Sequence, residues 1–235
     1  MIDIHTHILP GVDDGASDMR ESLKIIEKGL KEGIKTFVLT PHIKDDSAWG
    51  KIDNIKEIFL ALVKECKKNG LDVKLLLGAE LLLVPDIVEK IKNNILVTIG
   101  GEGKYILLEL PFSQLPIYTE NILFGLLTKG IIPIISHIER YLYLRRDLDM
   151  IHRWIDQGIM TQINTGSLTG KYGWTIKQTA KKLLKEKLVH TMASDVHRFD
   201  ASKSLFLDAV RIASKISPIN EVEKITHWLP GVNEI

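Results

Sequence analysis

The sequence predicts an α/β protein that forms a distorted (β/α)7 barrel with a metal site at the C-terminal ends of its strands. Short apolar segments alternate with segments of helical periodicity along the 235 residues, which favours a parallel sheet. Residues of metal-binding types follow one apolar segment after another. Only a closed barrel brings so many strand ends around one site, because an open doubly wound sheet gathers ligands from two or three neighbouring strands.

The expected elements are joined by short connections. The first apolar run leads to a loop over residues 8–16 and a helix at about residues 18–32. Asp18 and Glu21 supply a capping signal where this helix begins, and Gly33 supplies a stop where it ends. The other expected strands are at residues 36–39, 73–77, 105–108, 132–136, 160–163 and 189–193, and the other expected helices are at residues 52–68, 85–92, 120–128, 148–156, 175–185, 202–215 and 220–228.

The composition is that of a globular protein, with 45% hydrophobic and 26% charged residues and a formal net charge of +1. This balance indicates no bulk attraction to nucleic acid or to anionic membranes. No signal peptide and no apolar run of the roughly 20 residues needed to span a bilayer are present. The one cysteine, Cys66, follows a helical apolar pattern and points to burial in a reducing compartment. We therefore expect a cytoplasmic protein with a single domain over residues 1–235.

The strand ends carry the candidate metal ligands. His5 and His7 follow the first apolar run, and side chains at i and i+2 of a strand point to the same side. The ends of the other strands offer His42, Glu80, Glu109, His137, Asp195 and His197. An unpaired carboxylate would be costly to bury after the apolar runs that precede Glu80 and Glu109, so metal coordination is the better interpretation. The pattern predicts a metal-dependent hydrolase.

The remaining acidic and histidine candidates are interpreted from their context. Asp14 in Val-Asp-Asp-Gly would be a turn residue on its own, but beside these ligands it is expected to bind metal. Asp13 is interpreted as a turn residue or as a partner of a ligand. His152, His190 and His227 are assigned to packing or to the surface.

Several motifs extend over nearly the whole chain. They are MIDIHTHILPGVDDGA at residues 1–16, Thr40-Pro41-His42, Gly78-Ala79-Glu80, the Leu108-Glu109 strand end, Ser136-His137-Ile138-Glu139-Arg140-Tyr141, Asn164-Thr165-Gly166-Ser167-Leu168 and Ala193-Ser194-Asp195-Val196-His197. In this order they resemble the metal-dependent tyrosine phosphatases of bacterial capsular and exopolysaccharide operons, members of the polymerase and histidinol phosphatase (PHP) superfamily. Ile138 stands where that family usually has proline, and Thr165 where it usually has alanine; neither change removes a ligand.

The resemblance implies the PHP form of the barrel and a trinuclear site, most readily with three Mn²⁺ ions and with iron or zinc as alternatives. It assigns one ion to His5, His7, Glu80 and Asp195, a second to Glu80, Glu109 and His137, and a third to Asp14, His42 and His197. Independently, a mixed imidazole and carboxylate set without thiolate suits manganese, iron or zinc. Such ions give a metal-bound hydroxide at neutral pH and neutralise phosphoryl oxygens.

The resemblance also implies the reaction, which is hydrolysis of phosphotyrosine in a protein. Arg140 would grip the phosphate, and Asp195, His197 and His42 are the conceivable proton donors, with no choice possible among them. The expected substrate is the C-terminal tail of a bacterial tyrosine kinase that controls capsular polysaccharide synthesis. The loop at residues 164–174 either lines the substrate mouth or is an ordinary Gly-rich connector. Neither nucleic acid binding nor membrane insertion is expected, and the oligomeric state stays open.

Three alternatives compete with this interpretation. Histidinol-phosphate phosphatase, or another PHP phosphoesterase, would use the same scaffold and metals, but the opening motif argues against the former. An amidohydrolase also begins with His-x-His, yet it usually bridges its metals with a lysine where this chain has Glu109. A binding module without turnover should have lost some ligands, and here the full set is present.

Overall fold

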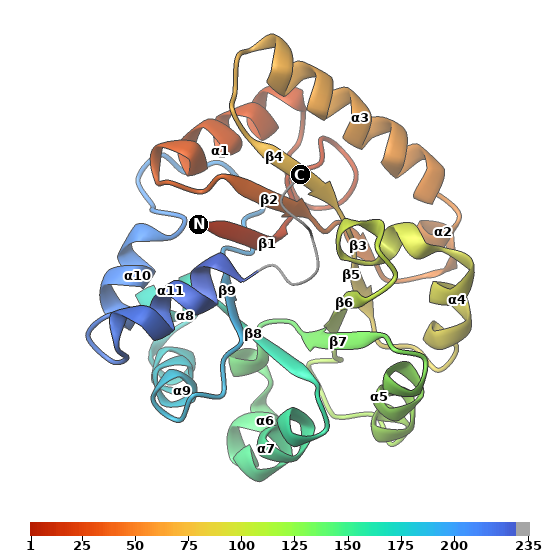
Figure 1. Cartoon of the computed structure of the whole chain (residues 1–235), viewed down its shortest axis with the longest axis vertical. Helices are drawn as coiled ribbons and strands as arrows, with labels where there is room; N and C mark the ends of the chain where they lie inside the picture. Colours follow the sequence, from red (N-terminus) through yellow and green to blue (C-terminus); the bar gives the residue numbers. More distant parts are fainter. Residues whose placement is uncertain (229–235) are drawn as a thin grey trace.

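The computed structural model describes residues 1–228, apart from the side chain of residue 93, and its strands curl into a ring surrounded by helices (Figure 1). The strands are β1 (Ile2–Thr6), β2 (Thr36–Leu39), β3 (His42–Ile43), β4 (Lys74–Leu77), β5 (Glu80–Leu82), β6 (Tyr105–Glu109), β7 (Ile132–Ile135), β8 (Met160–Asn164) and β9 (Thr191–Ala193). They pair in the orders β1-β2-β4 and β3-β5-β6-β7-β8-β9, and every pair is parallel.

The nine described strands occupy seven positions in the ring, because two of these positions each contain two strands separated by a break. Thr40-Pro41 separates β2 from β3, and Gly78-Ala79 separates β4 from β5, while the pairing continues across both breaks. The ring closes where Thr6 bridges Val196, just after β9. The backbone N–H of Asp195 donates to the carbonyl of His5 at this closure, over 3.0 Å. The predicted seven-stranded barrel is therefore confirmed, in a distorted form.

Helices cover the outside of the ring (Figure 1). The α-helices are α1 (Met19–Lys31), α2 (Asp46–Trp49), α3 (Ile52–Lys68), α4 (Ile87–Asn93), α5 (Thr119–Thr128), α6 (Leu142–Arg146), α7 (Leu148–Asp156), α8 (Thr165–Thr169), α9 (Trp174–Lys185), α10 (Leu207–Ala213) and α11 (Ile219–His227). Short 3-10 turns lie at η1 (Ile95–Val97), η2 (Ile99–Gly101) and η3 (Ile138–Arg140). No described helix has both the length and the apolar character that a bilayer crossing requires.

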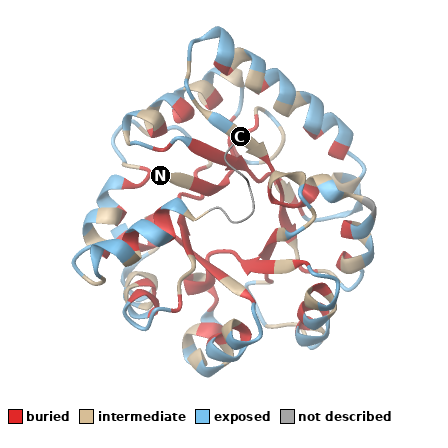
Figure 2. Cartoon of the chain, in the orientation of Figure 1, coloured by how far each residue is buried: buried red, intermediate tan, exposed pale blue. Residues whose placement is uncertain are grey.

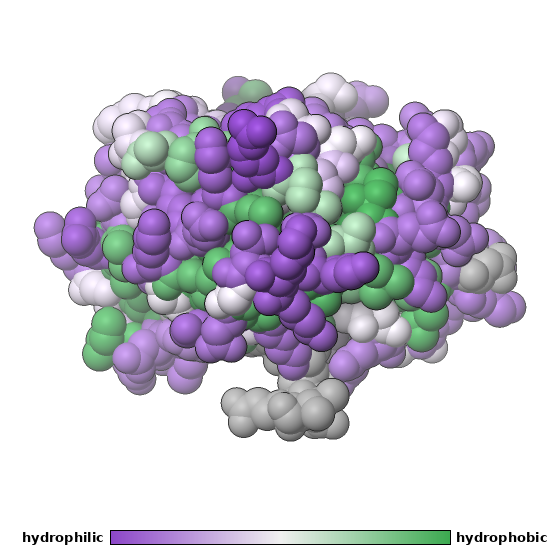
Figure 3. All heavy atoms as spheres, turned by 90° about the horizontal axis from the view of Figure 1, so that it is seen from above, coloured by the Kyte–Doolittle hydropathy of each residue, from purple (hydrophilic) through white to green (hydrophobic). Residues whose placement is uncertain are grey.

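Two buried apolar clusters support the ring. The larger one lies between the strands and the helices, where buried residues mark the inner faces of both (Figure 2). It includes Cys66, whose predicted burial is confirmed. The smaller cluster takes one residue from each of several strands, including Ile4, Val38 and Leu107, and fills the barrel interior. Polar residues cover most of the outer surface in Figure 3, with apolar side chains visible between them.

The first helix begins as its sequence predicts. The Asp18 carboxylate accepts from the backbone N–H of Glu21 over 2.9 Å. The Glu21 carboxylate does not return to Asp18, however, but accepts from the backbone N–H and hydroxyl of Ser17, both over 2.8 Å. It also accepts from the backbone N–H of Phe199 over 3.0 Å, so this cap joins α1 to the loop after β9.

The helix expected at residues 202–215 is shorter than predicted and begins at Leu207. The preceding segment is held in a loop by Glu32 at the end of α1. The Glu32 carboxylate accepts from the backbone N–H groups of Leu205 and Phe206 over distances of 2.9 and 2.8 Å. A carboxylate at the start of a helix also interacts favourably with the helix dipole, so a residue distant in sequence sets the start of α10.

Glu32→Ala should lower the free energy of unfolding by about 1.5–3 kcal/mol, because it leaves several backbone N–H groups without their charged acceptor. Urea denaturation of the purified protein measures this change. Glu27→Ala, an exposed position on the same helix, is the matched control. An equal effect of the two substitutions would contradict the role given to Glu32.

Candidate metal centre

The structure brings the predicted ligands to the C-terminal end of the ring. The ligands occupy strand ends or the segments that follow them, with His5 in β1, His42 at the start of β3, Glu80 at the start of β5, Glu109 at the end of β6, His137 after β7, and Asp195 and His197 after β9. His7 follows β1, and Asp14 lies in the loop that comes next. Apart from Asp14, whose side chain is 68% exposed, these residues are buried or partly buried.

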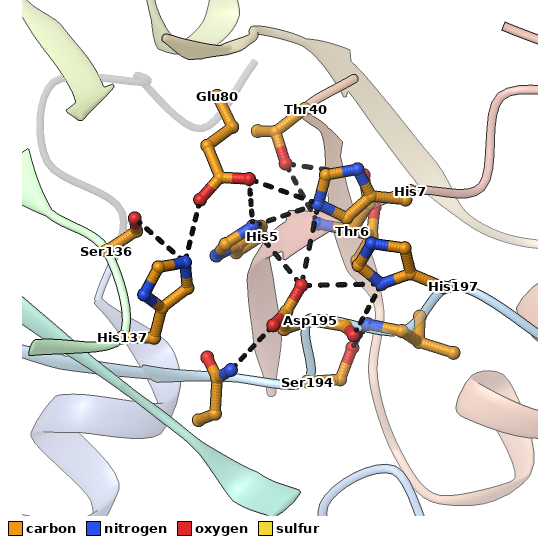
Figure 4. Close-up of polar contacts among 12 residues, drawn as sticks. His5, Thr6, His7, Thr40, Glu80, Ser136, His137, Ser194, Asp195 and His197 are labelled. Carbon is orange, nitrogen blue, oxygen red and sulfur yellow. Dashed lines mark hydrogen bonds and ion pairs between the residues drawn. The ribbon is translucent and has the colours of Figure 1, made fainter. Parts of the chain in front are cut away.

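Glu80 lies at the centre of the cluster (Figure 4). Its Oε2 atom is 3.2 Å from His5 Nε2 and 3.4 Å from His7 Nε2, while its Oε1 atom is 3.1 Å from His137 Nε2. The two Nε2 atoms of His5 and His7 are 3.0 Å apart, so both rings point to the same place, as their spacing predicts. Asp195 Oδ1 approaches the same two nitrogens, each at 3.5 Å.

The other ligands extend this cluster in two directions. On one side, Asp14 Oδ1 is 3.6 Å from His42 Nε2 and 3.5 Å from His197 Nε2. On the other side, Glu109 Oε1 is 3.7 Å from His137 Nε2. Three overlapping groups place one ligand atom from each member within 4.8 Å of the others: His7, Asp14, His42 and His197; His5, His7 and Glu80; and His42, Glu80 and Glu109.

Buried polar atoms in this cluster fit a bound cation. Within this cluster, Glu80 Oε2 and His42 Nδ1 are two of the buried side-chain atoms of the described residues that make no hydrogen bond. His42 Nδ1 is 3.0 Å from Glu80 Oε2, but the two atoms are not aligned for a hydrogen bond. Unsatisfied buried groups are costly, and imidazole nitrogens facing carboxylate oxygens are the donor set of manganese, iron and zinc sites. The residues therefore fit divalent metal.

The backbone is held in an uncommon conformation at two of the ligands. His137 has φ of 32° and Asp195 has φ of 51°, both in the left-handed region that residues other than glycine seldom adopt. Each is the second residue after a strand, where this conformation turns the chain away from the strand direction. Such conformations persist when the surroundings enforce them, and they concentrate at functional sites.

Two amides in β8, those of Gln162 and Asn164, orient the predicted ligands, and the sequence alone assigns neither of them this role. Gln162 Oε1 accepts from the backbone N–H of His137 over 2.9 Å and lies 3.1 Å from His5 Nδ1. Gln162 Nε2 donates to Asn164 Oδ1, and Asn164 Nδ2 donates to Asp195 Oδ2 over 2.6 Å. Gln162 and Asn164 have the same i, i+2 spacing as His5 and His7. This spacing places both amide side chains on the same side of β8.

The loop after β1 is fixed by Asp13, which acts as a partner of a ligand. Its Oδ2 atom is 2.8 Å from His7 Nδ1 and accepts from the backbone N–H of His42 over 3.0 Å. Its Oδ1 atom accepts from the backbone N–H of Gly15. A Cβ atom at position 15 would lie 1.9 Å from the carbonyl oxygen of His7, so only glycine allows the loop to fold back this closely.

Opposite charges shift the pKa values of the buried groups. Burial alone would lower the pKa of His5, but Glu80 and Asp195 outweigh it and raise that pKa to about 9. Burial is likewise outweighed at His7, where the hydrogen bond that the ring donates to Asp13 and the interactions with Glu80 raise the pKa to about 10. Burial would raise the pKa of Glu80, but the surrounding histidines hold it well below its ordinary value. The cluster therefore balances buried charges of both signs.

The predicted ligands other than His5 and His7 line a cavity of about 290 Å³, which is also lined by Lys44, Phe112, Arg140 and Tyr172. Arg140 Nη1 donates to Asp195 Oδ2 over 3.4 Å. Tyr172 belongs to the segment at residues 164–174, which contains α8 and contributes to the cavity wall. A second cavity of about 390 Å³ shares His197 with the first and extends along the loop after β9.

The histidines assigned to packing or to the surface lie outside the cluster. His152 is half exposed and faces Glu186 at 3.9 Å. His190 Nδ1 lies 3.2 Å from the backbone nitrogen of Thr161. His227 contacts the carbonyl of Glu223 in its own helix.

Comparison with known proteins identifies the relatives of this chain. The sequence model of the family described as capsular polysaccharide synthesis, CpsB/CapC, matches residues 1–229. The tyrosine-protein phosphatase YwqE of Bacillus subtilis (strain 168) is 33% identical over 197 residues, which cover 84% of this chain and 77% of YwqE. The tyrosine-protein phosphatase CpsB of Streptococcus agalactiae is 31% identical over 217 residues, which cover 90% of this chain and 89% of CpsB.

Solved structures show the same relationship. A crystal structure from work on the metal-dependent tyrosine phosphatases YwqE from Bacillus subtilis and CpsB from Streptococcus pneumoniae has a TM-score of 0.89 and 30% identity, covering 96% of this chain and 91% of that chain. A histidinol phosphate phosphatase from Lactococcus lactis has a TM-score of 0.57 at 11% identity, covering 94% of this chain and 93% of that chain. The second likeness concerns the fold alone.

In the presence of chelator, the protein should lose stability as the pH rises from about 6.5 to about 10. The folded-state pKa values of His5 and His7 lie above their ordinary value of 6.5, so their stabilising protonation is complete below about pH 6.5 and lost through about pH 9 to 10. Denaturant midpoints across this range measure the change. His7→Gln should flatten the dependence, and a wild-type protein that gains stability would contradict the electrostatic balance described above.

Gln162→Leu should weaken metal binding by about 10- to 100-fold, because it removes the acceptor that orients His5 and the backbone of His137. Titration of the metal-stripped protein with Mn²⁺ against a competing chelator measures the affinity. Gln157→Leu changes an exposed glutamine at the end of α7 and is the control. Unchanged affinity in Gln162→Leu would show that the amide does not support the ligands.

Proposed function

The chain belongs to the CpsB/CapC family of capsular polysaccharide synthesis, and from this premise we propose that it is a metal-dependent protein-tyrosine phosphatase. The observation that carries the proposal is the convergence of imidazoles and carboxylates on a cavity that also contains an arginine. Phosphoryl transfer depends mainly on positioning and charge neutralisation, which such a site supplies. Residues 1–235 are proposed as one phosphatase domain, of which residues 229–235 lie outside the described part of the chain.

We propose that the site takes three divalent cations, most readily Mn²⁺, with iron or zinc as alternatives. The proposed ligand sets are His5, His7, Glu80 and Asp195; Glu80, Glu109 and His137; and Asp14, His42 and His197. The overlapping ligand groups support this number, and the donor chemistry supports this choice of metals. When bound, such cations supply Lewis acidity that activates water and neutralises phosphoryl oxygens.

The protein's own residues would bind the phosphoryl group and assist the leaving group. Arg140 presents guanidinium N–H groups to the cavity, which suits the bidentate binding of phosphate. Both oxygens of Asp195 have partners, Arg140 and the Asn164 amide at Oδ2 and two imidazoles at Oδ1. We therefore propose that Asp195 binds metal and orients Arg140, and we prefer the other two candidates as proton donors. His42 and His197 line the cavity and remain the proposed proton donors. A phenol leaving group, with pKa near 10, needs little help from an acid.

The proposed substrate is phosphotyrosine in a protein, and more specifically the C-terminal tail of a bacterial tyrosine kinase that controls capsular polysaccharide synthesis. The similarity to named tyrosine-protein phosphatases supports the phosphotyrosine part. The aromatic side chains at the cavity are compatible with a tyrosyl ester. The single buried cysteine supports a reducing, cytoplasmic setting for the reaction.

Metal-stripped protein should release phosphate from a phosphotyrosine peptide only after Mn²⁺ is added, and the activity should disappear with chelator. His5→Ala should abolish this turnover, because it removes a ligand at the centre of the cluster. Phosphate release is the measurement, and circular dichroism of the variant checks that it is folded.

His152→Ala is the matched control, since this histidine lies outside the cluster. Near-normal turnover in His5→Ala would refute the site assignment. Silence on the peptide followed by activity on histidinol phosphate would keep the barrel and its metals but assign the protein to the competing phosphatase class.

A further inference from the structure

The guanidinium of Arg140 lies over two aromatic rings from separate segments. Its Cζ atom is 4.9 Å from the centre of the Phe112 ring and 4.7 Å from the centre of the Tyr172 ring. Phe112 follows β6, whereas Tyr172 lies between α8 and α9. We propose that Phe112 and Tyr172 form an aromatic clamp, meaning these two rings around Arg140, that positions the guanidinium for the phosphoryl group. This inference rests on the proposed function.

Arg140 needs such a clamp because little else in the described structure restrains it. Its one ion pair is a single contact of Nη1 with Asp195 Oδ2 at 3.4 Å, and the pair is not bidentate. The Arg140 side chain is 26% exposed, so water competes for the remaining N–H groups. A long side chain of this kind loses rotamer entropy whenever it is fixed to bind a ligand. Two rings that fix it beforehand remove part of that cost.

The clamp also holds the guanidinium away from the wrong partners. The cavity is rich in carboxylates, and an unrestrained arginine would be drawn towards Glu109 or deeper onto Asp195. Ring faces attract the cation without using its N–H donors, because the interaction is with the π-system. The N–H groups that do not reach Asp195 thus remain available for an anion.

The two rings are themselves held by their surroundings. The Phe112 ring stacks on the His137 ring, with centroids 5.4 Å apart and planes 17° apart. The centroids of the Phe112 and Tyr141 rings are 5.2 Å apart. Tyr172 is partly buried and lies over Gly166, where an added Cβ atom would come within 3.2 Å of the Tyr172 ring. The clamp therefore links Arg140 to a predicted metal ligand on one side and to α8 on the other.

A different role for the rings is to contact the phenyl ring of the substrate directly. Phe112 is 44% exposed, which makes it accessible for such a contact. The two roles differ in what Arg140 contributes. A clamp acts only through Arg140, so removing a ring should have no further effect once the arginine is gone. A direct contact would weaken substrate binding whether or not Arg140 is present.

The test is a double-mutant cycle on metal-loaded protein, with inorganic phosphate as the ligand and calorimetry as the measurement. Phe112→Leu and Tyr172→Leu should each weaken phosphate binding by about 2- to 30-fold, the range of a cation–π contact. Tyr172→Phe should retain the affinity within about twofold, because it keeps the ring. In the Arg140→Ala background, Phe112→Leu should change the affinity no further.

Phe124→Leu, on the exposed face of α5, is the matched control, and metal content is measured in every variant. Additive losses in the cycle would overturn the clamp, as would leucine variants that bind phosphate like the wild type but turn over the phosphotyrosine peptide poorly. Absence of phosphate binding in the wild type would also overturn it. A wild-type protein that binds phosphate with the expected coupling but releases none from the peptide would support the clamp and refute the proposed function.

Discussion

The burial of one carboxylate, Glu80, is the constraint on which the rest of the site depends. An ionised group with almost no exposure is tolerated only when opposite charges or metal ions surround it. Imidazoles from β1, β3 and the end of β7 supply that environment from different parts of the ring. A flat sheet could not bring these strand ends together, so the curvature of the sheet and the chemistry of the site depend on each other.

The breaks in two strand positions also serve to place ligands around Glu80. Thr40-Pro41 and Gly78-Ala79 interrupt two strand positions just before His42 and Glu80, and β3 and β5 then resume the pairing with the ligands at their first residues. The left-handed backbone of His137 and Asp195 achieves a similar redirection at two other strand ends. Regular strands would carry these side chains past the centre, and the irregularities return them to it. Local distortion and metal-binding geometry are thus the same structural feature.

The sequence was most informative where chemistry is local. A histidine or carboxylate directly after an apolar run, as at Glu109 or His137, reveals both a strand end and a candidate ligand. The i, i+2 spacing of Gln162 and Asn164 marks two polar side chains on one side of a strand, but the partners that give them a role are more than twenty residues away and cannot be read from that spacing. The start of α10 was misplaced for the same reason, since the carboxylate that fixes it belongs to α1. Contacts across the ring depend on the tertiary structure, and a local sequence pattern does not reveal them.

His5 and His7, which are assigned to the same ion, have different partners on their outer ring nitrogens. The outer nitrogen of His5 faces a neutral amide, whereas that of His7 faces a carboxylate. A carboxylate partner makes an imidazole a more basic donor. The two rings are therefore unlike ligands of the one ion assigned to them, although a single residue separates them, and His7 would donate more strongly to that ion than His5. The asymmetry comes from β8 on one side and from the loop after β1 on the other, so the surroundings of this ion would be uneven before any substrate arrives.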